Sequence, residues 1–137
     1  MLMHRETLEL RTRGRGFHEI TGEVGAIVVR SGVLDGLCHL FIQHTSASLL
    51  ITENADPDVL TDLETWISEL AADGDRRFRH TAEGPDDMSA HVRTLLTETA
   101  LAIPVSAGKL ALGTWQGIFV WEHRANPHAR RVVVSVP

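Results

Sequence analysis

The period of the hydrophobic residues changes along this chain, and the order of these changes limits the folds that it can adopt. From 6 to 13, apolar residues alternate with charged ones, which is typical of a strand with one solvated face. From 20 to 28 they recur at helical spacing, with Thr21 as the expected N-cap and Gly32 as the C-terminal stop. The first third therefore predicts a strand and then a helix.

Two apolar strands are expected next, over 37–44 and 48–53. Asp56 can cap a helix that has Pro57 in its first turn and ends at Asp73-Gly74, and a second helix is expected from about 87 to 98. The residues expected to face the core are Leu60, Leu63, Ile67 and Leu70 in the first of these helices and Met88, Val92, Leu95 and Leu96 in the second.

Strands return after residue 103, over 110–112, 117–121 and 131–136, with Gly and Pro turns between them. Strands with one early helix, then two helices, then strands indicate an α+β fold with the helices grouped on one side of the sheet. A chain of 137 residues that is 43% hydrophobic fits one domain, 1–137.

Membrane and thiolate chemistry are not expected. No apolar run approaches the roughly 18 residues that a membrane helix needs, and Met1–Glu6 lacks the apolar region of a signal peptide. A cytoplasmic protein is therefore expected. Cys38 is the single cysteine, so an intrachain disulfide and an all-thiolate metal site are excluded. Because it lies in an apolar run, we expect it to be an inert core residue.

The net charge of −5 is distributed unevenly. Residues 52–99 hold twelve acidic and four basic residues, a net charge of −8, and the remainder holds six acidic and nine basic residues, a net charge of +3. A nucleic-acid partner is not expected, because a general nucleic-acid binder would present a dominant basic face. The acidic block suits either a solvated helical surface or a cation site.

Eight histidines are many for this length, and one segment groups two of them with carboxylates. His80 precedes a loop with Glu83 and Asp86, and His91 lies one turn into the next helix. Imidazoles and carboxylates together are ligands for divalent metals: zinc is the default without a thiolate, and manganese or magnesium are alternatives if oxygen ligands predominate. Asp86 can instead simply favour the helix N-terminus through its dipole. His44 is the natural third histidine ligand.

Polar side chains follow the strand over 37–44 and the one after it. His44, Thr45 and Ser46 stand at a strand end, where ligands commonly bind, although an ordinary turn also explains these hydroxyls. Glu53 and Asn54 precede the helix at Pro57 and are not explained by helix capping.

The segment 113–117 places two glycines around a bend between two apolar strands. Backbone N–H groups there can approach an anion, with the Thr114 hydroxyl beside them, while a plain hairpin with Trp115 plugged into the core is an equal alternative. Of the remaining histidines, His39 alternates within a strand, and His4, His18, His123 and His128 are expected to be solvated.

Four segments together resemble one known family. They are 44–47 (His-Thr-Ser-Ala), 53–56 (Glu-Asn-Ala-Asp), 80–91 from His80 to His91, and 112–116 (Leu-Gly-Thr-Trp-Gln). In this order and at similar spacing they resemble the YjbQ-like family, also called the secondary thiamine-phosphate synthase family. The resemblance covers essentially the whole chain.

The resemblance implies a compact α+β protein with a mixed, barrel-like sheet, assembled as a homotrimer, with His44, His80 and His91 as metal-site residues. It also implies a weak thiamine-phosphate synthase activity, which joins a pyrimidine methyl diphosphate to a thiazole phosphate and releases pyrophosphate. The apolar strand over 131–136 would be a hazard as an exposed edge, which also favours an oligomer.

The chain departs from the family pattern at two places. Asp87 stands where the family usually has Asn, and the turn 124–130 replaces an Asp-Gly-Pro-Arg-like turn, which leaves the role of Arg130 open. The expected protein is a metal-dependent enzyme acting on a phosphorylated metabolite; a non-catalytic oligomeric module that binds a metal or such a metabolite is the alternative. The expected site residues are Glu53 and Asp86 for catalysis, Thr45, Ser46, Asn54, Thr114, Gln116 and Arg130 for substrate, and His44, His80 and His91 for the metal.

Overall fold

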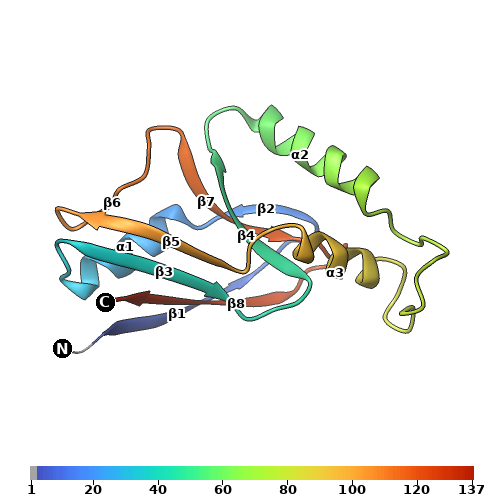
Figure 1. The fold of residues 1–137 in the computed structure, drawn as a ribbon, viewed down its shortest axis with the longest axis horizontal. Coiled ribbons are helices and arrows are strands. Elements are labelled where there is room, and N and C mark those ends of the chain that lie inside the picture. The colour runs from blue at the N-terminus through green and yellow to red at the C-terminus, as the bar shows by residue number, and fades with distance from the viewer. Residues whose placement is uncertain (1–2) are drawn as a thin grey trace.

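A computed structural model describes residues 3–137, so the first two residues of the N-terminal segment considered for a leader lie outside it. Within that range the chain forms three helices and eight strands, which confirms the α+β class (Figure 1). No helix there is long and apolar enough to cross a membrane. The elements are β1 (His4–Arg11), β2 (Gly16–Glu19), α1 (Thr21–Ser31), β3 (Gly36–Ile42), β4 (Ala47–Glu53), α2 (Pro57–Leu70), α3 (Asp87–Leu95), β5 (Ala100–Ser106), β6 (Lys109–Leu110), β7 (Gln116–Glu122) and β8 (Ala129–Val136).

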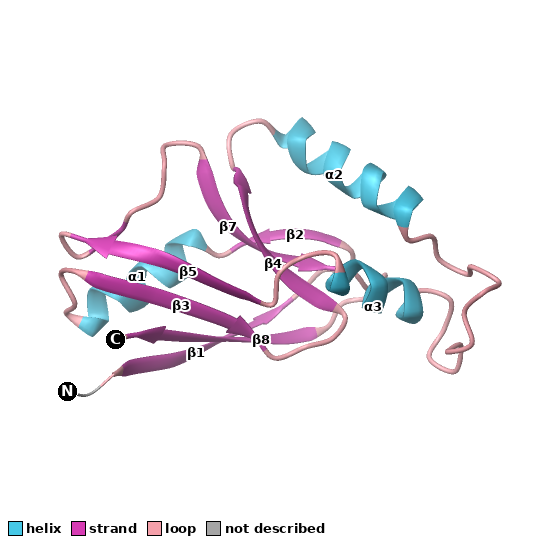
Figure 2. Ribbon diagram, in the orientation of Figure 1, coloured by secondary structure: helices cyan, strands magenta, loops and turns pink. Residues whose placement is uncertain are grey.

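The strands form a five-stranded sheet of order β1-β8-β3-β5-β6 and a three-stranded sheet of order β2-β7-β4 (Figure 2). Every pairing between these strands is antiparallel, whereas a mixed sheet was expected. Only β5 and β6 are joined by a short hairpin, and the other pairs bring together strands that lie far apart in the chain. The curved sheets give the barrel-like shape that the family resemblance implied.

The hydrophobic core lies between α1 and the inner faces of the sheets. α1 contributes Val24, Ile27 and Val28, and β3 contributes Cys38 and its alternate neighbours, with every second residue of β3 exposed on the other face. Burial raises the pKa of the Cys38 thiol to about 11, so the side chain is an inert core residue as expected.

Helix α1 ends as expected, at Gly32 in the left-handed conformation, but it begins differently. Thr21 is its first residue rather than its N-cap; its hydroxyl donates to Glu19 and accepts from the Ile118 amide. The strand β2, just before the helix, was missed by the sequence reading, because its four residues contain no alternating pattern.

Helices α2 and α3 lie together at one end of the molecule, while α1 lies at the other end (Figure 1). The expectation of helices grouped on one side therefore holds for two of the three. Asp56 caps α2 as expected, because its carboxylate accepts from the Asp58 amide at 2.9 Å. Only Ile67 of α2 is fully buried, and Leu70 is exposed.

The prediction of which face of α3 is buried is wrong. Its buried residues are mainly polar, whereas Leu95 is 81% exposed and Leu96 is 52% exposed. The physical reason is Arg93, a nearly inaccessible residue whose guanidinium donates twice to the Ala71 carbonyl at the end of α2. Hydrogen bonds and ion pairs made by this polar face, rather than the packing of leucines, attach α3 to the rest of the fold. The buried residues of the helix are Asp87, Ser89, Ala90, Arg93 and Thr94.

The strand β8 lies inside its sheet, between β1 and β3, so the argument for an oligomer from an exposed edge at 131–136 is wrong. The chain's first strand covers it along its length, from His4 opposite Val136 to Arg11 opposite Ala129. Sequence order alone gave no sign of this pairing between the two ends of the chain.

Candidate metal centre

His80, Asp87 and His91 converge on one point at the start of α3. The Asp87 Oδ2 atom lies 2.6 Å from His80 Nε2 and 3.2 Å from His91 Nε2. The three residues offer ligand atoms that all lie within 4.8 Å of one another. Asp87 is buried, while His80 and His91 are partly accessible, so the cluster is open to solvent on the histidine side.

The fold places these three residues for simple reasons. Asp87 and His91 are four residues apart on α3 and therefore share one face of the helix. His80 arrives from the loop that precedes α3, and its ring meets that of His91 edge to face with centroids 5.5 Å apart. The sequence analysis identified both histidines, and the structure brings them together.

His91 and Asp87 each make a further contact outside the cluster, which holds the side chain in place. The Thr45 carbonyl lies 3.0 Å from His91 Nδ1 and must accept its proton, which leaves Nε2 with a lone pair when the ring is neutral. The Arg124 guanidinium contacts Asp87 Oδ1 at 2.9 Å. Burial alone would raise the pKa of Asp87, but the bond from His80 and the charge of Arg124 hold that pKa below its usual range.

The His91 Nε2 atom faces the Asp87 carboxylate oxygen at 3.2 Å, and a cation bound by both groups would favour this arrangement. Ligands around a tetrahedral zinc ion stand about 2.0–2.1 Å from it and so roughly 3.4 Å from one another. The separation of 2.6 Å between Asp87 and His80 is shorter than this, so His80, the most exposed of the three, would have to move outward to admit a zinc ion.

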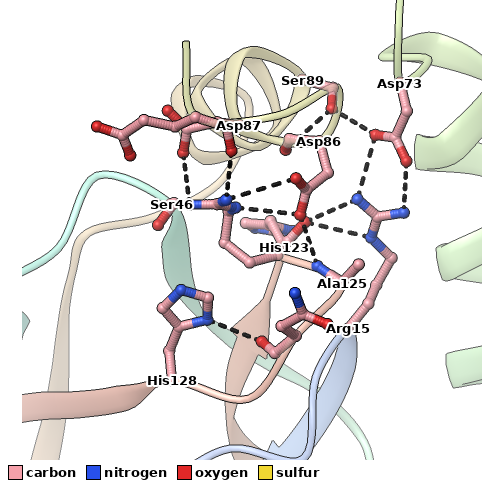
Figure 3. Close-up of polar contacts among 12 residues, drawn as sticks. Arg15, Ser46, Asp73, Asp86, Asp87, Ser89, His123, Ala125 and His128 are labelled. Atoms are coloured by element: carbon pink, nitrogen blue, oxygen red, sulfur yellow. Dashed lines mark hydrogen bonds and ion pairs between the residues drawn. The ribbon is translucent and has the colours of Figure 1, made fainter. Parts of the chain in front are cut away.

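Asp86, expected as a catalytic carboxylate, is engaged in structural bonds. Its Oδ2 accepts from the Ala125 amide at 2.8 Å and from Arg124 Nε at 3.1 Å (Figure 3). Burial would raise the pKa of Asp86, but these bonds hold it below the usual range. It fixes the turn at 124–125 beside α3.

A second ionic network supports α3 from below. Asp73 receives a bidentate contact from Arg15 at 2.8 and 3.1 Å and a short bond from the Ser89 hydroxyl (Figure 3). Arg15 also donates to the His123 carbonyl. These contacts join the segment after α2, the helix α3 and the turn after β7, so they fix the position of the metal-ligand candidates.

His44 is not part of the cluster in this conformation, because its Nε2 accepts from the Arg131 amide at 2.8 Å. It lines two adjoining pockets with Thr45, one of which also contains His91. Burial lowers the pKa of His44, and the charge of Arg130 adds to the effect. Its assignment as a metal ligand stays a prediction, and Asp87 takes its place in the geometric set.

Ser46 and Arg130, both expected to bind substrate, meet at the start of β4. The Arg130 guanidinium, 4% exposed, donates to the Ser46 carbonyl and hydroxyl and forms a buried ion pair with Glu122. Glu122 in turn accepts from Thr12 at 2.6 Å. Burial would raise the pKa of Glu122, but Arg130 and Thr12 hold it below its usual range.

The other expected site residues lie at the far end of β4. This strand is seven residues long, so Glu53 is about 20 Å from Ala47 along it. Glu53 pairs with Gln116 in the sheet, and its side chain accepts from the Asp56 amide, which explains it as a helix-start residue. One chain therefore does not bring Glu53, Asn54, Thr114 and Gln116 to the histidine cluster.

The turn before β7 also differs from an anion cradle. The Gly113 amide already donates to the Gln116 side chain at 2.8 Å, and the Asn54 amide donates to the Trp115 carbonyl. Trp115 is 63% exposed and plugs no core. The assignment of Thr114 and Gln116 to substrate binding stays a prediction.

Sequence reasoning missed three residues of this region. Asp87 was noted only as a departure from a family pattern, and Arg124 as part of a turn. His123 was expected to be solvated but is fully buried, with Nε2 2.9 Å from the Ser48 hydroxyl. The spacing of Asp87 and His91 was the one sequence signal that could have identified Asp87, because residues four positions apart lie on the same face of a helix.

Comparison with known proteins shows what this chain is similar to. Residues 6–137 match the model of the family described as UPF0047 protein YjbQ-like. A UPF0047 protein of Synechocystis is 53% identical, over 97% of this chain and 90% of its own length. The UPF0047 protein YjbQ of Escherichia coli O157:H7 is 38% identical, over 98% of both chains.

Solved structures agree with this. The crystal structure of an uncharacterized conserved protein of the YjbQ/UPF0047 family from Clostridium acetobutylicum superposes with a TM-score of 0.88 at 36% identity, covering 96% of this chain and 99% of that one. A conserved hypothetical protein from Thermus thermophilus gives a TM-score of 0.87 at 38% identity, with the same coverage.

Proposed function

The chain belongs to the YjbQ-like UPF0047 family, and from this premise we propose that it binds a divalent metal ion through His80, Asp87 and His91 and acts on a phosphorylated small metabolite. The observation that carries the proposal is the contact between the Asp87 carboxylate and the two Nε2 atoms, with His91 Nδ1 held by a carbonyl. That second bond presents the opposite ring nitrogen as a ligand.

The residues present fit a metal of the zinc class. Two imidazoles and one carboxylate are the protein ligands of many catalytic zinc sites, which keep a further position open. A divalent ion bound there would supply a Lewis acid for a phosphoryl oxygen. Zinc is preferred over magnesium or manganese because nitrogen ligands outnumber oxygen ligands in the set.

The chain's own residues have separate roles in this proposal. Arg124 holds the Asp87 carboxylate in place, and the Thr45 carbonyl sets the His91 tautomer. Thr45 and Ser46 border the adjoining pocket, where the Thr45 hydroxyl would meet a phosphorylated ligand, while the Ser46 hydroxyl accepts from Arg130. A group transfer that releases pyrophosphate, as in thiamine-phosphate synthesis, is the reaction class proposed first.

The test of the metal site is elemental analysis of the purified chain after incubation with zinc and removal of free ion. About one ion per chain is expected, and H80A and H91A are expected to lose it. H4A is the matched control, because His4 lies in β1 and pairs with Glu6 there. Retention of the ion by both H80A and H91A would contradict the proposal.

The reaction is tested separately, by pyrophosphate release from a pyrimidine methyl diphosphate in the presence of thiazole phosphate. Loss of turnover in the H91A variant, with turnover kept in H4A, would support an enzyme that uses this centre. Equal turnover in H91A and the unaltered chain would assign the reaction elsewhere.

The second candidate is a non-catalytic module that binds a metal or a phosphorylated metabolite. One observation favours it: Asp86 and Glu53, the carboxylates expected to act as bases, are both engaged in structural hydrogen bonds. Binding of a phosphorylated ligand that persists in D86A, without turnover of any candidate substrate, is the result that this alternative predicts.

We also propose that three copies assemble. Leu37 and Phe41 are 49% and 44% exposed on the outer face of β3, and this apolar face has no covering element among residues 3–137. Sedimentation equilibrium is expected to give the mass of a trimer, near three times 15.1 kDa. A chain that sediments as a monomer at micromolar concentration would contradict it.

A further inference from the structure

Two pockets adjoin the metal-ligand candidates on the His91 side and form one groove. The first, about 430 Å³, is lined by His44, Thr45, His91, Thr94, Leu95, Thr97 and Thr99. The second, about 450 Å³, is lined by Phe41, Ile42, Gln43, His44, Thr45, Ser46, Thr99 and Arg130. Because they share His44, Thr45 and Thr99, a single ligand can occupy both.

The two ends of this groove differ in the groups that they offer. At one end lies the guanidinium of Arg130, which forms an ion pair with the buried Glu122. Arg131 contributes only its backbone amide, which donates to His44, because its side chain pairs with Glu9. The bonds of Arg130 use Nε and Nη2, and no hydrogen bond from Nη1 to a residue within 3–137 is found. The Arg130 guanidinium is therefore the charged donor at this end, from which a phosphate oxygen can accept.

The other end is neutral and rich in hydroxyl groups. Four threonines line it, and the C-terminal residues of α3 belong to it. The negative end of the helix dipole disfavours an anion there. Thr94 is 8% exposed, and its buried Oγ1 has no hydrogen-bond partner among residues 3–137. A buried hydroxyl without a hydrogen-bond partner destabilises the fold unless a ligand or a water molecule supplies the missing hydrogen bond.

We propose that this groove binds a phosphomonoester of a small polyhydroxylated molecule, with its phosphate at the Arg130 end and its hydroxyl groups among Thr45, Thr94, Thr97 and Thr99. The inference deepens the proposed function, on which it rests for the phosphorylated ligand. It places the ligand's hydroxylated part beside His91, on the side of the ring that faces the groove.

The probe for the test is glycerol 3-phosphate, compared with inorganic phosphate and with glycerol, by titration calorimetry on the chain treated with a chelator. Glycerol 3-phosphate is expected to bind about tenfold more tightly than phosphate, since one or two hydrogen bonds of roughly 1 kcal/mol each are added. Glycerol alone is expected to show no measurable binding.

Two variants separate the ends of the groove. T94V keeps the side-chain shape and is expected to lower the affinity for glycerol 3-phosphate several-fold to tenfold, while the affinity for inorganic phosphate stays unchanged. R130K keeps the charge opposite Glu122 but removes the guanidinium, so it is expected to weaken the binding of both ligands. R77Q is the matched control, because Arg77 is exposed and pairs with Asp75 away from the groove. T94V is expected to fold normally, because the hydroxyl it removes has no partner among the described residues.

The proposal would be overturned if glycerol 3-phosphate bound T94V and the unaltered chain with equal affinity. It would also be overturned if inorganic phosphate bound the unaltered chain as tightly as glycerol 3-phosphate does. The metal site is judged independently from metal content. If H80A does not retain zinc, but the same variant treated with a chelator still binds glycerol 3-phosphate, both proposals stand. If zinc remains in H80A while T94V weakens the probe, only the metal assignment fails.

Discussion

Replacing His123 by Gln is expected to make folding much less sensitive to acid. The imidazole is inaccessible to solvent, its Nε2 contacts the Ser48 hydroxyl at 2.9 Å, and its buried Nδ1 has no hydrogen-bond partner among the residues that the structure describes. Burial lowers the pKa of His123 to about 3, and the charges of Arg93 and Arg15 add to the effect. The ring is therefore neutral in the folded chain at any pH above that value.

The sign of the pH effect follows from the lowered pKa. In the unfolded chain the ring titrates near its ordinary pKa of about 6.5, so between about pH 6.5 and pH 3 the unfolded state binds the extra proton. The free energy of unfolding therefore falls as pH falls through this window. At pH 4.5 the loss from this residue is about 3 kcal/mol, taken from two pKa units at 1.36 kcal/mol each.

The measurement is urea unfolding followed by tryptophan fluorescence at pH 7.5 and pH 4.5, with a chelator present. The H123Q variant keeps an amide able to reach Ser48 and is expected to lose about 3 kcal/mol less than the unaltered chain between these two pH values. H128Q is the control, because the His128 ring lies before β8 and bonds the carbonyl of nearby Asn126, and this variant should behave as the unaltered chain. The same acid sensitivity in H123Q and H128Q would refute the reasoning.

Three other substitutions test packing and backbone. E122Q should lower the free energy of unfolding by about 3–5 kcal/mol in urea, because it leaves the buried Arg130 charge unpaired. G14A should cost about 2 kcal/mol or more by the same measurement, because Gly14 has φ +105 and a Cβ there would lie 2.5 Å from the Ala125 carbonyl oxygen. D56A should cost about 1 kcal/mol through loss of the cap on the Asp58 amide, and an unchanged thermal midpoint would contradict this.

Local patterns predicted the elements well where their physics is local. The Asp56-Pro57 start of α2 and the Gly32 end of α1 depend on capping geometry that neighbouring residues supply, and both were correct. The alternation in β3 is also visible as one buried and one exposed face. These features need no knowledge of what packs against them.

Features set by distant partners could not be read from the sequence. The position of β8 inside its sheet depends on pairing with β1 from the other end of the chain. Arg93 reversed the expected face of α3, because a buried guanidinium that bonds the end of α2 outweighs the exposure of Leu95. A helical period shows which residues share a face, but it does not identify the face that is buried.

The candidate site divides in the same way. His80 and His91 were identified because they lie close in sequence around one helix start. Glu53 and His44 were assigned by chemistry, but the length of β4 separates Glu53 from the cluster, and the Arg131 amide engages His44. Chemical type suggested which residues can bind a metal, and only the fold decides which of them meet.

The most direct test of the metal centre is a crystal structure of the zinc-loaded chain with anomalous diffraction data collected at the zinc edge. A single peak is expected about 2.0–2.1 Å from His80 Nε2, from His91 Nε2 and from Asp87 Oδ2, with His44 still bonded to the Arg131 amide. A zinc peak bound by other residues, or no peak near these three at saturating zinc, would contradict the account.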